Sequence, residues 1–161
     1  MTANKHLAHL YVLPEDDANS RIATGFHLEV DSIRQMDVLP VAGGWAEVVN
    51  RFKSDHVSEL DRYPTRYMIL MVDFDKKSDR LKKVKAAIPE HLVERVFVLG
   101  SWSEPEDLKK NKLGTLESIG QTLAKECRDK TNTLWDHALI KHNVPEVARI
   151  PDNILDVLFK H

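Results

Sequence analysis

The sequence predicts an α/β fold: a mostly parallel, four-stranded sheet with helices on both faces, followed by a helical C-terminal extension. Short apolar runs alternate with longer segments whose apolar residues recur at helical spacing, and this order is typical of a parallel sheet. One run, residues 68–72 (MILMV), is apolar throughout, which indicates a strand buried on both faces. Strand patterns stop after residue 110, and amphipathic helical patterns take their place.

Each element follows from its own pattern. The predicted strands are residues 6–13, 37–41, 66–72 and 95–99. The predicted helices are residues 18–28, 45–60 and 76–87, one that begins after Ser103 as N-cap, and, in the extension, 116–128, 134–142 and 153–159. We expect residues 1–110 to form the α/β domain and residues 111–161 to pack on it as one unit.

Composition narrows the classes of function. The chain has 161 residues and a net charge of −2, so nucleic-acid binding requires a local basic patch rather than a global positive charge. One cysteine, Cys127, excludes an internal disulfide and fits a reducing compartment. The N-terminus lacks the apolar segment of a secretory signal, and no run reaches transmembrane length. We therefore expect a cytoplasmic protein that does not enter the membrane.

Acidic residues follow three of the four predicted strands. Glu15 follows the first strand, Asp73 and Asp75 the third, and Glu104 the fourth. The carboxyl ends of parallel strands share one edge of a sheet, and ligands bind at that edge in open α/β folds. If the extended backbone continues past the third strand, Asp73 and Asp75 point the same way. Carboxylates gathered in this manner repel unless a cation lies between them, so the pattern predicts a Mg²⁺ or Mn²⁺ site.

A simpler interpretation exists for most of these acidic residues, but not for Glu15, which lies at the strand tip before the helix, where capping does not need it. Acids at helix starts cap the backbone and complement the helix dipole, which accounts for Asp16 and Asp17 without any ligand.

The segment after the third strand is also rich in basic residues. Lys76, Lys77 and Arg80 either hold a phosphate backbone beside the metal or form a solvated helix face.

Three motifs in order resemble the Toprim domain. They are Glu15 at the first strand tip (LYVLPE), Gly43-Gly44 after the second strand (LPVAGG) and the DxD of Asp73 and Asp75 (VDFD). Toprim domains, which have a Rossmann-like sheet, occur in topoisomerases, bacterial primases, recombination-repair proteins and nucleases of the overcoming-lysogenization-defect (OLD) type. The resemblance covers roughly residues 6–110 and is nearest to the OLD-type branch.

The resemblance implies Mg²⁺-dependent phosphodiester chemistry on DNA or RNA. It implies that Asp73 and Asp75 hold the metal, that Glu15 has an acid–base or metal-linked role, and that Glu104 or Glu106 adds a further ligand. Two positions depart from the family pattern: Asp16 replaces the usual glycine, and Asn19 stands where the nuclease branch often has an acid. With no topoisomerase body or ATPase domain in the sequence, we expect a small standalone Toprim-like nuclease. Its C-terminal helices are the candidate surface for a partner or a second copy.

Two alternatives remain open at this stage. A receiver-like signalling domain would use Asp73 as its phosphate acceptor and Ser101 after the fourth strand, but Gly43-Gly44 and Asp75 do not fit that pattern. A non-catalytic binding or scaffold module would keep the fold without the chemistry, and the departure at Asp16 favours it.

Overall fold

The structure, a computed structural model, describes residues 7–159 and confirms the predicted α/β class. Its four strands form one parallel sheet in the order β2-β1-β3-β4. The strands are β1 (His9–Pro14), β2 (Met36–Val38), β3 (Arg66–Met71) and β4 (Val96–Leu99). Residue 6 of the predicted first strand lies outside the described residues. Because all four strands run the same way, their carboxyl ends lie along one edge of the sheet.

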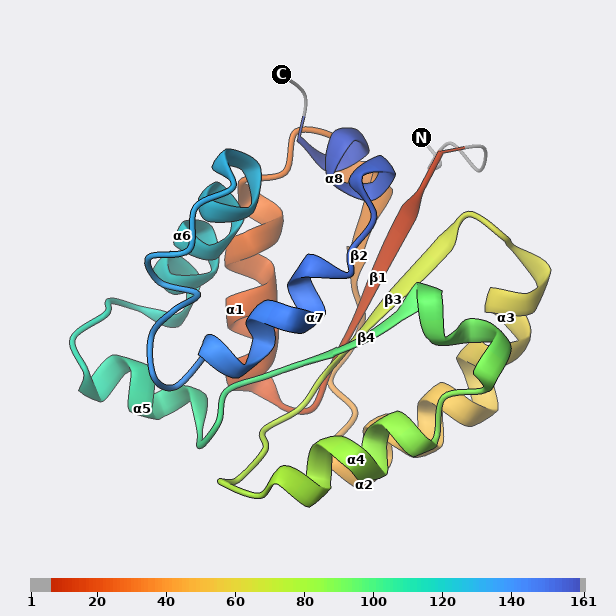
Figure 1. The fold of residues 1–161 in the computed structure, drawn as a ribbon, viewed down its shortest axis with the longest axis horizontal. Coiled ribbons are helices and arrows are strands. Elements are labelled where there is room, and N and C mark those ends of the chain that lie inside the picture. Colours follow the sequence, from red (N-terminus) through yellow and green to blue (C-terminus); the bar gives the residue numbers. More distant parts are fainter. Residues whose placement is uncertain (1–6, 160–161) are drawn as a thin grey trace.

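Helices cover both faces of the sheet (Figure 1). The helices α1 (Asp17–Leu28), α6 (Leu116–Asp129) and α8 (Asp152–Leu158) pack on one face, and the helices α2 (Trp45–Arg51), α3 (Val57–Arg62) and α4 (Ser78–Ala86) pack on the other. Met68, Leu70 and Val72 are buried against the second group, while Ile69 is buried against the first. The unbroken apolar run therefore supplies both cores, as a strand covered on both faces requires.

A π-helical segment, Phe52–His56, joins α2 to α3 where the sequence predicts one helix over 45–60. Phe52 and Leu60 are both fully buried in the same core. In a regular α-helix eight residues would carry Leu60 about 80° around the axis from Phe52. The wider π turn removes most of this rotation, so both side chains stay on the core face.

Two glycines let α1 and α6 approach closely. A Cβ atom on Gly25 would lie 1.9 Å from the carbonyl oxygen of Glu117, and one on Gly120 would lie 1.9 Å from that of Ile22. Any side chain at either position would force the helices apart. The extension thus shares a core with the α/β part: α6 and α8 pack on the sheet face that α1 also covers.

The predicted helix over 134–142 is wrong. This segment consists of turns and a short 3₁₀ helix, Lys141–Asn143, which leads into α7 (Val144–Ala148). The buried carboxylate of Glu126 accepts hydrogen bonds from the backbone N–H groups of Leu134 (2.8 Å) and Trp135 (3.3 Å). A side chain from α6 therefore satisfies the first amides, and the chain folds around it as turns.

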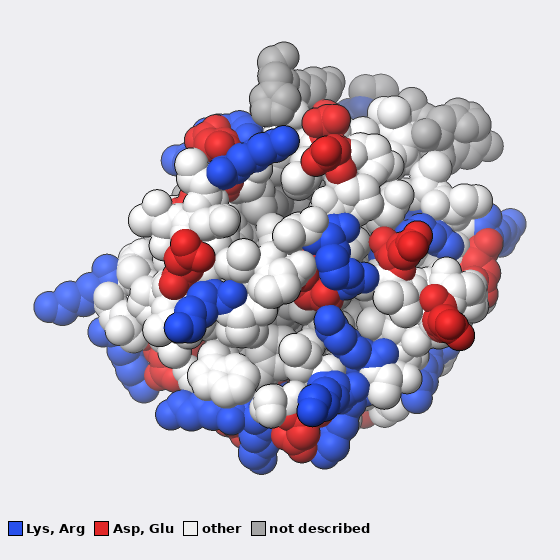
Figure 2. All heavy atoms as spheres, in the orientation of Figure 1, with Lys and Arg blue, Asp and Glu red and all other residues white. Residues whose placement is uncertain are grey.

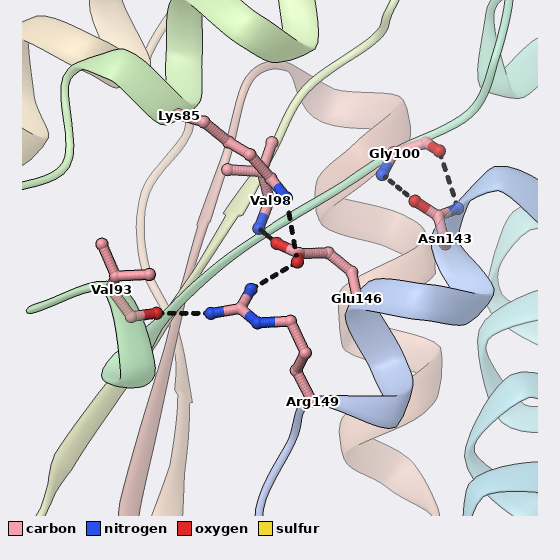
Figure 3. Close-up of polar contacts among 7 residues, drawn as sticks. All are labelled: Lys85, Val93, Val98, Gly100, Asn143, Glu146 and Arg149. Carbon is pink, nitrogen blue, oxygen red and sulfur yellow. Dashed lines mark hydrogen bonds and ion pairs between the residues drawn. The ribbon is translucent and has the colours of Figure 1, made fainter.

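The segment that follows covers the outer edge of β4 (Figure 3). Glu146 accepts a hydrogen bond from the Val98 N–H (2.9 Å), and the Asn143 side chain accepts from the N–H and donates to the carbonyl of Gly100 (3.1 and 2.8 Å). An exposed strand edge is a site for unwanted pairing with other chains. Here side chains take the place of a fifth strand.

Within residues 7–159, none of the helices has the length and apolar character needed to cross a membrane.

Candidate functional site at the carboxyl edge of the sheet

Glu15 and Asp73 meet at the carboxyl edge of the sheet, where the adjacent strands β1 and β3 end. The pairing of these strands continues one step beyond them, because the N–H of Glu15 donates to the carbonyl of Met71 (2.8 Å). The Asp73 N–H then donates to Oε2 of Glu15 (2.6 Å). The structure therefore brings together two of the predicted site residues and places one carboxylate directly on the backbone of the other.

Asn19 joins this pair and was missed by the sequence analysis as a site residue. Its Nδ2 donates to Oδ1 of Asp73 (3.0 Å) and to Oδ1 of Asp16 (2.9 Å). Asp16 is the N-cap of α1 and also accepts from the Asn19 N–H (3.0 Å), so the capping interpretation of Asp16 is confirmed. The position of Asn19, three residues after the N-cap, was the available signal: it points a side chain at the start of the helix, beside the strand ends.

The double glycine fixes the main chain of Glu15. The N–H groups of Gly43 and Gly44 both donate to the Glu15 carbonyl oxygen (2.9 and 3.2 Å). Gly43 has φ +96° and Gly44 has φ +137°, backbone conformations that side chains disfavour. The glycines thus allow a tight turn that delivers two donors to one carbonyl and holds the Glu15 side chain toward Asp73.

Asp75 is not aligned with Asp73, contrary to the expectation from the DxD spacing. The extended backbone continues only to Phe74, whose N–H donates to the Ser101 carbonyl (3.1 Å). Asp75 and Lys76 then take left-handed conformations, with φ of +52° and +58°, inside a turn closed by the Lys77 N–H and the Phe74 carbonyl (2.9 Å). This turn has the two positive φ angles of a type I′ turn. It breaks the two-residue alternation on which the predicted alignment depended.

Glu104 is the N-cap of α5 (Pro105–Lys110), where the sequence predicted Ser103. Its N–H donates to the Asp107 carboxylate (3.4 Å), which also accepts from the Ser103 hydroxyl (2.5 Å). The contacts of Glu104 are thus those of a helix start. Its neighbour Glu106 is the acid of this segment whose charge acts on Asp73.

The site carries excess negative charge. The pKa of Asp73 is raised to about 7, mainly by burial and also by the charges of Glu15, Asp16 and Glu106, while the Asn19 hydrogen bond lowers it. Burial likewise raises the pKa of Glu15, against the lowering effect of the Asp73 N–H. Among the residues that the structure describes, no Lys, Arg or His side chain forms an ion pair with Glu15, Asp16 or Asp73.

The predicted basic residues lie beside the site but differ in their exposure. Lys76 and Lys77 are exposed, and Figure 2 shows Lys and Arg side chains along the lower edge of the molecule, where Figure 1 places α4. Arg80 is largely enclosed: it donates to the Asp73 carbonyl (3.0 Å), lies 3.9 Å from the Asp75 carboxylate and stacks on Trp45. The two lysines are thus available to a ligand, whereas Arg80 stabilises the loop after β3 through its contacts with Asp73 and Asp75.

Across residues 7–159, no three His, Cys, Asp or Glu side chains lie close enough together to hold a metal ion as a ready cage. The Glu15 carboxylate contacts the backbone N–H of Asp73, and Asn19 links the Asp73 carboxylate to that of Asp16. Comparison of the chain with protein-family models, with curated proteins and with solved structures gave no match. The resemblance to the Toprim domain therefore stays a prediction from three short motifs.

Proposed function

We propose that the Glu15–Asp73 pair binds Mg²⁺ or Mn²⁺ and that the metal-bound site hydrolyses phosphodiester bonds in a nucleic acid. One observation carries the proposal: at the ligand-binding edge of a parallel sheet the Glu15 carboxylate accepts from the backbone of Asp73, its charge acts on the Asp73 carboxylate, and none of the described cations forms an ion pair with either side chain. A half-buried cluster of like charges is costly unless a counter-ion neutralises it. A divalent cation is the simplest such counter-ion.

The donor set fits magnesium. Mg²⁺ prefers oxygen ligands, keeps several of its waters, and is commonly bound by one or two carboxylates together with substrate phosphates. It therefore does not need a cage of three protein side chains. Glu15 and Asp73 would hold the ion, and Asp75 would join them only if the turn from Phe74 to Lys77 opened.

The chain's own groups have distinct tasks in this proposal. When bound, the metal supplies charge neutralisation and an activated water. Glu15, whose pKa burial raises, accepts or returns a proton. Asn19 and the Asp73 N–H fix the geometry of the two carboxylates, and Lys76 and Lys77 attract the phosphate backbone. A cytoplasmic location fits such a substrate.

The C-terminal helices contribute less to this proposal than their amphipathic patterns predict. Ile154 and Leu158 of α8, and Ile119 and Leu123 of α6, are buried in the core of the same chain. Their apolar faces are thus already covered. An oligomer or partner contact would have to use the other faces of these helices.

The decisive experiment combines metal titration with a cleavage assay. Wild type, Asp73→Asn and the matched control Asp79→Asn are titrated with Mn²⁺ and assayed with Mg²⁺ on single-stranded DNA, double-stranded DNA and RNA. Asp79 lies on α4 and pairs with Lys83 (3.4 Å) outside the site. We expect Asp73→Asn to lose cleavage by roughly 100-fold or more, as removal of a metal-linked catalytic group does, and Asp79→Asn to keep it.

The other outcomes separate the alternatives. Cleavage by Asp73→Asn at the wild-type rate would refute the mechanism. Mn²⁺ binding without cleavage of any substrate would favour a non-catalytic binding module. Uptake of a labile phosphoryl group from acetyl phosphate would favour a receiver-like domain, although the Ser101 hydroxyl is buried and donates to the Ser103 carbonyl (3.1 Å).

A further inference from the structure

Trp102 lies at the carboxyl edge of the sheet, in the loop that follows β4. Its carbonyl oxygen accepts from the N–H of Lys76 (2.7 Å), and its own N–H donates to the Leu139 carbonyl (2.8 Å). The loop after β4 is thus held beside the loop after β3, and the two lie together at the lower end of the sheet in Figure 1. Trp102 is therefore fixed next to the loop that carries Asp73, without being a ligand of the proposed metal site.

The burial of the residues around Trp102 reverses the usual order. Ser101 and Ser103 are buried, whereas the larger and more apolar Trp102 between them is partly exposed. The Ser101 hydroxyl donates to the Ser103 carbonyl (3.1 Å), and the Ser103 hydroxyl donates to the Asp107 carboxylate (2.5 Å). Folding more often buries the apolar side chain and leaves serine in water. The chain thus keeps part of an indole in contact with solvent at the edge where ligands bind.

A second partly exposed tryptophan, Trp45, lies at the same edge, but a cation already covers its ring. The Arg80 guanidinium stacks on Trp45, 5.1 Å from the ring centroid. Within residues 7–159, no cation lies over the Trp102 ring, and the aromatic ring that contacts it, that of His142, is tilted by 58° at 5.7 Å rather than stacked. Trp102 packs on the core that α4 covers, and its exposed part remains for a ligand. Of the two tryptophans, Trp102 is therefore the better surface for stacking.

Exposed lysines belong to both segments next to Trp102. Lys76 and Lys77 lie in the loop after β3, and Lys109 lies on α5, which begins just after Trp102. Proteins that bind single-stranded nucleic acid combine such cations, which hold the phosphates, with aromatic side chains on which the bases stack. In a duplex the bases already stack on one another, so only an unpaired base can offer its face to an indole.

We propose that Trp102 is a stacking surface for an unpaired base, and that the site therefore takes single-stranded nucleic acid. This inference rests on the proposed function, because it names the substrate class of the same site, but stacking is a binding contact and does not require hydrolysis. Lys76 and Lys77 hold the phosphates next to the stacked base. The backbone of the strand is thereby brought to the loop that carries Asp73.

The test measures binding in EDTA, so that neither metal nor cleavage enters. Fluorescence anisotropy follows two labelled strands of about 12 nucleotides: oligo-dT, and a strand with the same phosphates in which abasic residues replace the thymidines. We expect the wild type to bind oligo-dT about 10-fold more tightly than the abasic strand, since stacking of one base on an aromatic side chain contributes roughly that factor. Equal affinity for the two strands, or binding of neither, would overturn the proposal.

Three variants assign the stacking to Trp102. Trp102→Leu should weaken oligo-dT binding about 10-fold and leave abasic-strand binding unchanged, whereas Trp102→Phe, which keeps a ring, should retain most of the affinity. The matched control is Tyr67→Leu, a partly exposed aromatic at the other end of β3, which should bind like the wild type. Circular dichroism verifies each fold, and the wild-type comparison of the two strands stands even if Trp102→Leu does not fold. Unchanged oligo-dT affinity in a folded Trp102→Leu would refute the assignment.

The cleavage assay separates this inference from the proposed function. If the wild type cuts no nucleic acid but binds oligo-dT in a Trp102-dependent manner, the proposed hydrolysis fails and the stacking surface stands. If the wild type cuts single-stranded and double-stranded DNA at equal rates and Trp102→Leu does the same, the hydrolysis stands and this inference falls.

Discussion

The backbone N–H of Asp73 donates a 2.6 Å hydrogen bond to Oε2 of Glu15, a residue 58 positions earlier in the chain. This bond ties the ends of two neighbouring strands together through a carboxylate rather than through the backbone ladder. It also holds the Glu15 charge near the Asp73 side chain, where that charge adds to burial in raising the pKa of Asp73. The first predictions for the site begin from this contact.

Replacing Glu15 by Gln should lower the pKa of Asp73 from about 7. The glutamine still offers an oxygen to the Asp73 N–H, but it removes the negative charge that raises the Asp73 pKa. Glu15→Ala removes the acceptor as well and should cost about 1 kcal/mol of stability beyond Glu15→Gln. Carboxyl ¹³C NMR titration reports the pKa, and urea unfolding reports the stability. The exposed Glu47, mutated to Gln, is the control, and an unchanged Asp73 pKa in Glu15→Gln would show that the two charges are not coupled.

The contribution of Asp73 to the stability of the protein should fall as the pH rises from about 4 to about 7. The pKa of Asp73 is 3.8 ordinarily and about 7 in the folded protein, so the folded state binds this proton more tightly than the unfolded state. The free energy of unfolding then decreases across that interval and levels off above it. Because Asp73 is partly solvated, we expect a loss of about 1–2 kcal/mol rather than the full value of the shift.

Asp73→Asn provides the test of that pH dependence. The amide keeps an acceptor for Asn19 but cannot ionise, so the variant should be more stable than wild type by about 1–2 kcal/mol at pH 8 and equal to it near pH 4. Urea unfolding at both values measures the difference. Added Mg²⁺ should stabilise the wild type at pH 8 and leave Asp73→Asn unchanged. A stability difference that does not vary with pH would contradict the assigned titration.

The turn after β3 stores strain that a glycine should release. Lys76 has φ +58°, a conformation that costs a side-chain-bearing residue about 1 kcal/mol or more. Lys76→Gly should therefore stabilise the protein by about 0.5–1 kcal/mol despite the added freedom of the unfolded chain. Lys77→Gly is the matched control: Lys77 has φ −119°, so glycine relieves nothing there and should be neutral or destabilising. Chemical unfolding of the two variants at one pH decides between these outcomes.

The fold class could be predicted from the sequence because the strands and helices that define it have recognisable patterns over short runs of consecutive residues. The run 68–72 and the helical periodicity of 18–28 and 116–128 needed only local patterns, and the structure has β3, α1 and α6 at these places. The segment 134–142 failed because its amides bind Glu126, a partner from another helix that no local pattern reveals.

The site was predictable to a similar extent. Glu15 and Asp73 follow directly from their places at adjacent strand ends, provided that the sheet is parallel. The predicted alignment of Asp75 with Asp73 failed because Asp75 and Lys76 take positive φ angles, which the sequence alone does not indicate. Asn19 was seen only as a departure from a family pattern, although its amide links Asp73 to the helix cap.

In the segment that covers the edge of β4, substitution of Glu146 should destabilise the protein most. Its nearly buried carboxylate accepts from the Val98 N–H, from Lys85 (3.1 Å) and from Arg149, as Figure 3 shows. Burial raises its pKa, but these hydrogen bonds and the Lys85 charge outweigh burial and lower it overall. Glu146→Ala leaves the edge amide and two cations without their acceptor, so we expect a loss of about 2–4 kcal/mol, against almost none for the exposed Glu94→Ala.

The same carboxylate predicts a pH effect opposite in sign to that of Asp73. Because the folded pKa of Glu146 lies below its ordinary value of 4.5, its contribution is fully present above about pH 5 and is lost as the pH falls through the folded pKa. Glu146→Gln should therefore approach wild-type stability at low pH and fall below it at neutral pH. Loss of Glu146 also uncovers the edge of β4, so light scattering should detect more aggregation in Glu146→Ala than in Glu94→Ala. Equal aggregation of the two variants would mean that the edge is protected by other contacts, such as that of Asn143 with Gly100.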